Sequence, residues 1–126
     1  MEMDKKEAVL LALYAEYTQN VPDMRRVNAE TMRMEKPAFR WALMKLKIEG
    51  LVSGVEWAPD WARHPGEVKG MNRDRLMLTG AGVRRAESLA GIVEDNTPSE
   101  RRMRIAEMLS AIGCGIAANM IWNRMQ

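Results

Sequence analysis

The stretch MRMEKPAFRWALMKLKIEGLVSGV, residues 32–55, decides the fold of this chain. Pro37 suits the first turn of a helix, because the N–H that proline lacks has no partner there. Gly50 is suited to end that helix in a left-handed conformation. At about 100° per residue, one face of the intervening segment is apolar: Phe39, Ala42, Leu43 and Leu46. The pattern therefore predicts an amphipathic helix from about Lys36 to Gly50, followed by a β-strand over 51–57.

The residues before this helix predict two more helices. Asp4 is a candidate N-cap for a helix that ends near Gln19. Its leucines and tyrosines at helical spacing predict one buried stripe: Leu10, Leu13, Tyr14 and Tyr17. A short second helix is expected over roughly 28–32, with Arg33 in the following turn and Met34 reaching back to the core.

The residues after the predicted strand complete a hairpin and a fourth helix. Residues 75–78 can pair with the strand, and the prolines and glycines of 58–74 indicate a long hairpin loop, or wing. Thr79 can cap a helix whose Gly80 and Gly82 permit close packing in its first turn. Together these elements predict an α+β, mainly α fold: a winged helix-turn-helix with a wing of two to three strands and an appended C-terminal helix.

The C-terminal helix has the clearest start in the chain. The tetrapeptide TPSE at 97–100 supplies an N-cap, a proline at the first helical position and a glutamate at the third. The helix is expected to reach about Arg124, although Gly113 and Gly115 could bend or divide it. The expected division of the chain is a winged-helix domain at 1–91, a linker at 92–97 and the C-terminal helix at 98–126.

Two sequence motifs support this arrangement by resemblance. They are Phe39-x-x-Ala42-Leu43-x-x-Leu46-x-x-Glu49-Gly50-Leu51-Val52-x-Gly54-Val55 and Leu78-Thr79-x-x-Gly82. In this order and spacing the chain resembles the YjcQ-like family, small winged-helix proteins of bacteria and phages, from Lys5 to about Leu89. It resembles more loosely the winged helices of MarR- and PadR-type regulators. The chain departs from the pattern in a longer first turn region, 20–27, and a longer wing. The resemblance implies a winged-helix fold and a bacterial or phage origin, but no firmly assigned activity.

The composition limits the class of protein. With 126 residues, 47% of them hydrophobic, the chain is expected to form a core without metals or disulfides. A single cysteine, Cys114, excludes an intramolecular disulfide and is compatible with a cytoplasmic location. The N-terminal segment lacks a basic lead and a cleavage site, so no signal peptide is expected. Residues 105–122 are apolar but interrupted by Glu107, Ser110 and Asn119, which favours a packed helix over a membrane span. A net charge of +2 does not by itself imply nucleic-acid binding.

The outer face of the predicted helix 36–50 carries a second apolar stripe: Trp41, Met44 and Ile48. With four cations and one carboxylate, this segment has a net charge of +3 and is the most basic in the chain. In a DNA reader this face enters the major groove, its basic flanks contact phosphates and its apolar side chains contact thymine methyls or unstacked bases. Alternatively the last helix or a second subunit covers the stripe, because each exposed apolar side chain forgoes roughly 1.5–3 kcal/mol of burial.

Candidate nucleic-acid contacts are the basic residues of this helix and of the wing: Lys36, Arg40, Lys45, Arg63, Lys69 and Arg73. A basic wing that follows the minor groove is a useful second contact. The wing also carries the acidic residues Asp60, Glu67 and Asp74, so a solvated loop of mixed charge is the alternative.

The last helix carries an apolar stripe, Leu109, Ile112, Ile116 and Met120, and a row of small residues, Ala106, Ser110, Cys114 and Ala118. Small residues permit a tight helix–helix crossing. We therefore expect a homodimer through this helix, and the candidate protein interface is its apolar stripe together with Trp41, Met44 and Ile48. The alternative is that the helix folds back onto its own domain, over that second stripe. The cations at its start, Arg101, Arg102 and Arg104, are expected to pair with acidic neighbours or to contact an anionic partner, because the helix dipole disfavours them there.

The sequence offers little support for catalysis. His64 is the only histidine, and nothing brings it to Cys114. Since there is no phosphate-binding glycine loop, metal-ligand cluster or nucleotide motif, we expect no catalytic residue, metal or cofactor. The expected function is non-enzymatic: a DNA-binding or regulatory module. The alternative is a protein–protein interaction module on a winged-helix scaffold, whose covered reading helix binds no DNA.

Overall fold

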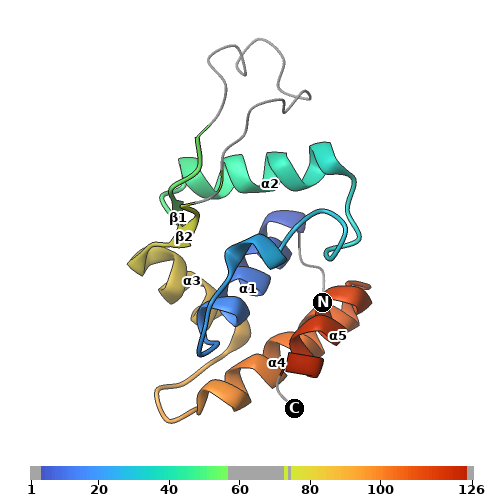
Figure 1. The fold of residues 1–126 in the computed structure, drawn as a ribbon. Coiled ribbons are helices and arrows are strands. Elements are labelled where there is room, and N and C mark those ends of the chain that lie inside the picture. Colours follow the sequence, from blue (N-terminus) through green and yellow to red (C-terminus); the bar gives the residue numbers. More distant parts are fainter. Residues whose placement is uncertain (1–3, 57–72, 74, 125–126) are drawn as a thin grey trace.

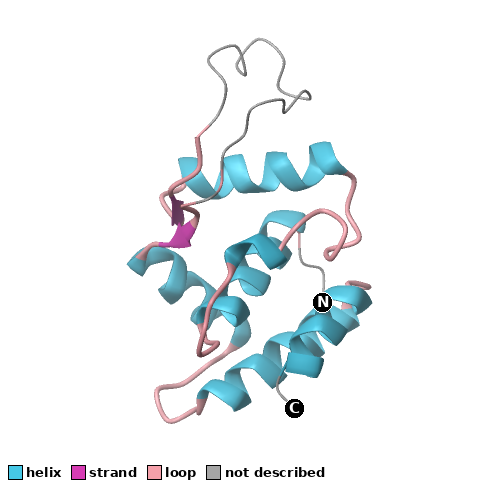
Figure 2. Ribbon diagram, in the orientation of Figure 1, coloured by secondary structure: helices cyan, strands magenta, loops and turns pink. Residues whose placement is uncertain are grey.

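The computed structural model describes residues 4–56, 73 and 75–124 (Figure 1), and this part is mainly helical with one small antiparallel sheet (Figure 2). Along the chain its elements are α1 (Lys5–Tyr17), the 3-10 helix η1 (Met24–Arg26), α2 (Lys36–Ile48), β1 (Val52–Ser53), β2 (Met77–Leu78), α3 (Gly80–Ala90), α4 (Pro98–Ala111) and α5 (Gly115–Arg124). α1 lies between α2 on one side and the α4–α5 pair on the other, and α3 also packs on it (Figure 1). The predicted α+β, mainly α class is therefore confirmed.

α1 is the centre of the core. Asp4 caps it by accepting a hydrogen bond from the backbone N–H of Glu7 at 2.8 Å, as predicted. Every residue from 8 to 16 is buried, whereas Tyr17, expected in the buried stripe, is 49% exposed, so the predicted stripe was too narrow and wrong at Tyr17. Alanines at 8, 12 and 15 separate the large side chains and let neighbouring elements approach on all sides. A helix that is apolar all round is buried all round.

α2 matches the predicted helix closely. It starts at Lys36 with Pro37 in its first turn, and Gly50 follows it with a left-handed φ of +75°. The predicted inner face is buried against α1: Phe39, Ala42, Leu43 and Leu46.

The predicted second helix over 28–32 was wrong. Residues 24–33 form η1 and a run of turns. Asn28 and Thr31 explain this, because each side chain accepts a hydrogen bond from the other's backbone N–H, at 2.9 and 3.0 Å. Such side-chain bonds offer the backbone an alternative to a helix. Arg33 then takes a left-handed φ of +54°, in the turn where it was expected, and Met34 packs against the core.

The two strands are shorter than predicted but pair as expected. Val52 lies opposite Leu78 and Ser53 opposite Met77, with the first pair buried and the second exposed. Residues 57–72, which hold most of the predicted loop, lie outside the described residues. A third strand is not among the elements of the part that the structure describes.

The predicted C-terminal helix is divided into two helices that pack against each other and on α1 (orange and red in Figure 1). Gly113 makes the break, because its φ of +92° is left-handed and the N–H of Cys114 returns to the carbonyl of Leu109 at 2.8 Å. The predicted capping box of Thr97 and Glu100 starts α4. Within the described ranges, no helix has both the length and the apolar character needed to span a membrane.

Candidate nucleic-acid interface

The outer face of α2 is open. Trp41 is 47% exposed and Ile48 is 70% exposed, and the Nζ of Lys45 lies 5.0 Å from the centroid of the Trp41 ring. Since α4 and α5 pack on α1, the alternative in which the C-terminal helix covers this stripe was wrong. The reason is the break at Gly113, which folds α5 back along α4.

Met44 does not belong to the exposed stripe, although it was expected there. Its side chain is only 6% exposed. On a helix Trp41 and Ile48 lie almost in line, whereas Met44 lies about 60° from Trp41 and about 40° from Ile48. It is displaced to the side of Lys47, whose Nζ donates a hydrogen bond to the carbonyl of Val55 beyond β1 at 2.6 Å.

The exposed stripe borders a groove of about 660 Å³ between α2 and the start of α1. Its apolar lining is Ala38, Trp41, Ala42 and Ile48, and its charged lining is Asp4, Lys5, Lys6, Lys45 and Glu49. Lys6 and Glu49 form an ion pair at 2.9 Å that joins the two helices. An exposed indole beside an exposed isoleucine forgoes roughly 1–2 kcal/mol of burial per side chain. This face is therefore suited to contact another molecule.

Several cations lie on α2 and in the turn before it. Among the described residues, Arg33, Lys36, Arg40 and Lys45 take part in none of the ion pairs of 4.0 Å or less. All four belong to the turn before α2 or to α2 itself. The positive charge of this edge is available for an anionic partner.

The arginines at the start of α4 are instead used inside the molecule. Arg101 donates to Tyr14 Oη at 2.8 Å and to Glu87 Oε2 at 2.6 Å, so it joins α4 to α1 and α3. Burial raises the pKa of Tyr14 above its ordinary value, and the hydrogen bond to Tyr14 raises the pKa of Arg101. Arg102 donates to the carbonyl of Thr18 and Arg104 to that of Gly91. These arginines were expected either to pair with acidic neighbours or to contact an anionic partner, and Arg101 does the first.

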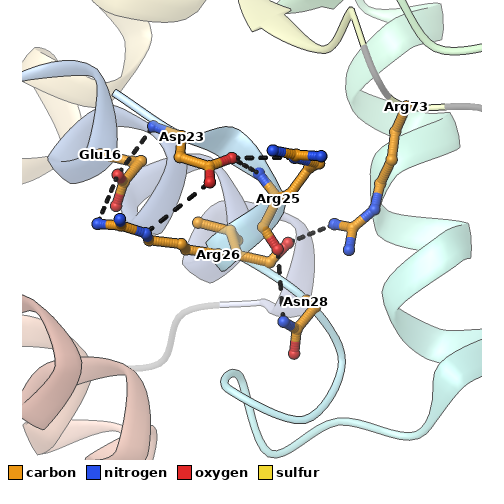
Figure 3. Close-up of polar contacts among 7 residues, drawn as sticks. Glu16, Asp23, Arg25, Arg26, Asn28 and Arg73 are labelled. Atoms are coloured by element: carbon orange, nitrogen blue, oxygen red, sulfur yellow. Dashed lines mark hydrogen bonds and ion pairs between the residues drawn. The ribbon is translucent and has the colours of Figure 1, made fainter. Parts of the chain in front are cut away.

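A polar cluster holds the segment that leads to α2 (Figure 3). Glu16, only 2% exposed, accepts from the backbone N–H of Asp23 at 3.0 Å and lies 3.9 Å from Nη1 of Arg26. Asp23 in turn accepts from the backbone N–H of Arg25, which lowers the pKa of its carboxyl. Sequence reasoning missed Glu16, for which the one signal is a carboxylate inside the apolar run LLALYAEY.

A second groove, of about 380 Å³, lies at the start of α2 and brings three predicted contacts together. It is lined by Asn28, Ala29, Glu30, Lys36, Phe39, Arg40 and Arg73. Arg73 donates from Nη1 to the carbonyl of Val27 and lies 5.4 Å from the Phe39 ring centroid. In Figure 3 its side chain reaches from the hairpin side toward residues 25–28. Lys45 lies on the other flank of α2, and the predicted contacts Arg63 and Lys69 lie outside the described residues.

The predicted interface on the last helix was wrong in part. Leu109 is fully buried in the core of the same chain, and Ile112 and Met120 are partly buried against that core. Only Ile116 of that stripe is exposed. Three of the small residues, Ala106, Cys114 and Ala118, are likewise buried in the core of the same chain. The physical reason is again the break, which turns both helices toward α1.

Among the described residues, we find neither a reactive thiol nor a metal-binding cluster. Cys114 is buried, and burial raises the pKa of its thiol, which disfavours the reactive thiolate. His64 falls outside the described residues. Residues 4–56 and 75–124 contain no group of three or more His, Cys, Asp or Glu able to hold a metal ion.

Comparisons with family models, with curated proteins and with solved structures gave no match to this chain. The resemblance to the YjcQ-like family therefore stays a prediction from the sequence motifs.

Proposed function

We propose that this chain is a non-enzymatic winged-helix protein that binds double-stranded DNA through α2. The observation that carries the proposal is the positive charge on the flanks of α2, where Lys36, Arg40 and Lys45 take part in no ion pair of 4.0 Å or less among the described residues. A stripe of lysine and arginine along one helix is the electrostatic footprint expected of a DNA-contacting surface.

The order of elements supports the winged-helix interpretation. α1, a turn, α2 and the β1–β2 pair follow one another, and α2 packs on α1 through its inner face. In such an arrangement α2 is the reading helix and the loop of the hairpin is the wing. η1 and the turns of 24–33 stand where the motif has its second helix. The cluster around Glu16 holds this segment in place without a helix.

The side chains of α2 divide between positioning and reading. Lys36 and Arg40 lie on one flank of α2, and Lys45 lies on the other. When α2 lies in the major groove, its two flanks face the phosphates of the two DNA strands. Trp41 and Ile48 offer apolar surface to the methyl group of thymine.

Fluorescence polarisation with a mixed-sequence duplex over a salt series tests the proposal. If Lys36, Arg40, Lys45 and Arg73 each neutralise one phosphate, the slope of log K against log salt is about −3 to −4. Lys45→Glu should weaken binding to every duplex and make the slope shallower by about 1. Arg84→Glu is the matched control, since Arg84 is an exposed cation on α3. No binding at low salt, or equal effects of the two variants, would overturn the proposal.

The alternative, a protein–protein interaction module, rests on the exposed Trp41 and Ile48 beside the 660 Å³ groove. A second subunit that covers this face would block DNA. Light scattering tests whether a second copy of the chain covers this face. A mass of 14.3 kDa, that of the monomer, at tens of micromolar would count against a homodimer. If a dimer forms and Trp41→Ala dissociates it, the alternative replaces the DNA proposal.

A further inference from the structure

We propose that the 380 Å³ groove at the start of α2 is a phosphate-binding site, which seats one phosphate of the DNA backbone and so fixes where α2 lies along the duplex. The inference rests on the proposed function for the source of the phosphate, but the site has its own chemistry. This groove, the entrance groove, is lined by Asn28, Ala29, Glu30, Lys36, Phe39, Arg40 and Arg73.

The charge of the entrance groove suits a phosphate. Its lining holds three cations, Lys36, Arg40 and Arg73, and one carboxylate, Glu30, for a net charge of +2. Lys36 and Arg40 are four residues apart on α2, so their side chains lie on the same flank of the helix. Neither is held in an ion pair within the described part of the chain. A phosphate bound there therefore compensates the positive charges of Lys36 and Arg40.

Arg73 is held in place before any ligand arrives. Its Nη1 donates to the carbonyl of Val27, its guanidinium lies over the Phe39 ring, and its own carbonyl accepts from the N–H of Leu76 at 3.1 Å. A guanidinium fixed at both backbone and side chain loses little entropy when it meets an anion. Its planar fork also matches the geometry of phosphate oxygens.

The opposite wall is also fixed. Asn28 is locked by its reciprocal bonds with Thr31 and by a longer bond from its Nδ2 to the carbonyl of Arg25, 3.4 Å. The groove thus joins the turn at 28–30 and the first turns of α2 to residue 73, which is distant from both in sequence. A phosphate bound there contacts the turn, the reading helix and the base of the hairpin together. Such contacts determine register and orientation on DNA and carry no base preference.

Two measurements on the full chain test the inference. In the polarisation assay, Arg40→Ala should weaken binding equally for unrelated duplexes and make the salt slope shallower by about 0.9, whereas Arg84→Ala should match the wild type. Separately, ¹⁵N–¹H NMR at constant ionic strength follows a titration with inorganic phosphate. The Asn28 side-chain amide and Arg40 Nε signals should shift to saturation in the wild type, and the Asn28 shift should disappear in Arg40→Ala.

The two measurements distinguish failure of the site from failure of the function. DNA binding with an unchanged slope in Arg40→Ala overturns the site and leaves the proposed function standing. Saturable phosphate binding without any DNA binding supports the site with free phosphate as its source and overturns the proposed function. If Lys36→Ala and Arg40→Ala both leave the slope and the phosphate titration unchanged, the inference is wrong.

Discussion

Gly82→Ala should destabilise the protein because α3 starts in direct contact with the hairpin. A Cβ built on Gly82 would lie 2.0 Å from the carbonyl oxygen of Leu51 and 3.3 Å from Cδ2 of Leu78. The Leu51 carbonyl cannot simply move away, since it accepts the backbone N–H of Thr79 at 3.1 Å. The clash therefore forces α3 and the hairpin apart, or breaks this hydrogen bond.

The size of the effect follows from opposing contributions. Overpacking a tight contact costs about 1–3 kcal/mol, and losing one backbone hydrogen bond costs roughly 1 kcal/mol. Replacing glycine by alanine in a helix returns up to about 1 kcal/mol. The net loss of unfolding free energy for Gly82→Ala is therefore roughly 1–4 kcal/mol. Gly80→Ala is the matched control: its Cβ meets only Nη1 of the flexible Arg84, at 3.5 Å, so its stability should be unchanged or higher by up to about 1 kcal/mol.

Urea unfolding followed by far-UV circular dichroism measures this difference. With a slope of about 1–3 kcal/mol per molar urea, Gly82→Ala should lower the midpoint by roughly 1 M, and Gly80→Ala should not lower it. Equal midpoints for the wild type and Gly82→Ala, or equal losses in both variants, would refute the close contact of α3 with Leu51.

Three further predictions concern the core, the buried network and acid stability. Leu109→Ala should cost about 2–5 kcal/mol in urea unfolding, whereas Ile116→Ala should change stability by less than about 1 kcal/mol; the reverse order would mean that the stripe faces outward after all. Tyr14→Phe should cost about 1 kcal/mol at pH 7, because it removes one buried hydroxyl and leaves its two partners paired. Because the folded pKa of Tyr14 is raised above 10.0, its protonation contributes stability below about pH 10 that is lost as pH rises through the folded pKa, and Tyr14→Phe should flatten that alkaline fall. The pKa values of Asp23 and Glu100 are lowered from 3.8 and 4.5 by backbone hydrogen bonds, so their contribution is present above these values and lost as pH falls through the folded pKa values. Unfolding curves from pH 7 to pH 3 should show this acid loss, and Asp23→Asn with Glu100→Gln should reduce it; an identical pH profile would contradict the assignment.

The elements whose signals are local were predicted well. Asp4, Thr79 and Thr97 each accept the hydrogen bond expected of an N-cap. The glycine that ends α2 is left-handed as expected. Gly82 permits the close approach for which the sequence suggested it. These features depend on residues within about one helical turn of each other, so a single segment contains all the information.

Several wrong predictions concern which face of a helix is buried. Met44 and Leu109 were placed by their spacing in a candidate protein interface, yet both are buried within the chain itself. Spacing shows that two residues share a face, but not which neighbour covers it. The contacts that decide this join distant stretches, such as Arg101 with Tyr14, 87 residues apart, and Arg73 with Val27, 46 residues apart.

The sequence by itself determined the helix of residues 36–48, its inner face, the proline in its first turn, the glycine that follows it and the strand pair after it, because spacing and turn residues act over a few positions. Only the tertiary structure decided that α5 folds back along α4 and leaves Trp41 uncovered, and that Arg73 meets Lys36 and Arg40 in one groove. The physical reason is that burial and charge compensation are properties of surfaces assembled from several segments. Their outcome depends on how the elements pack around α1, which no single stretch of the chain encodes.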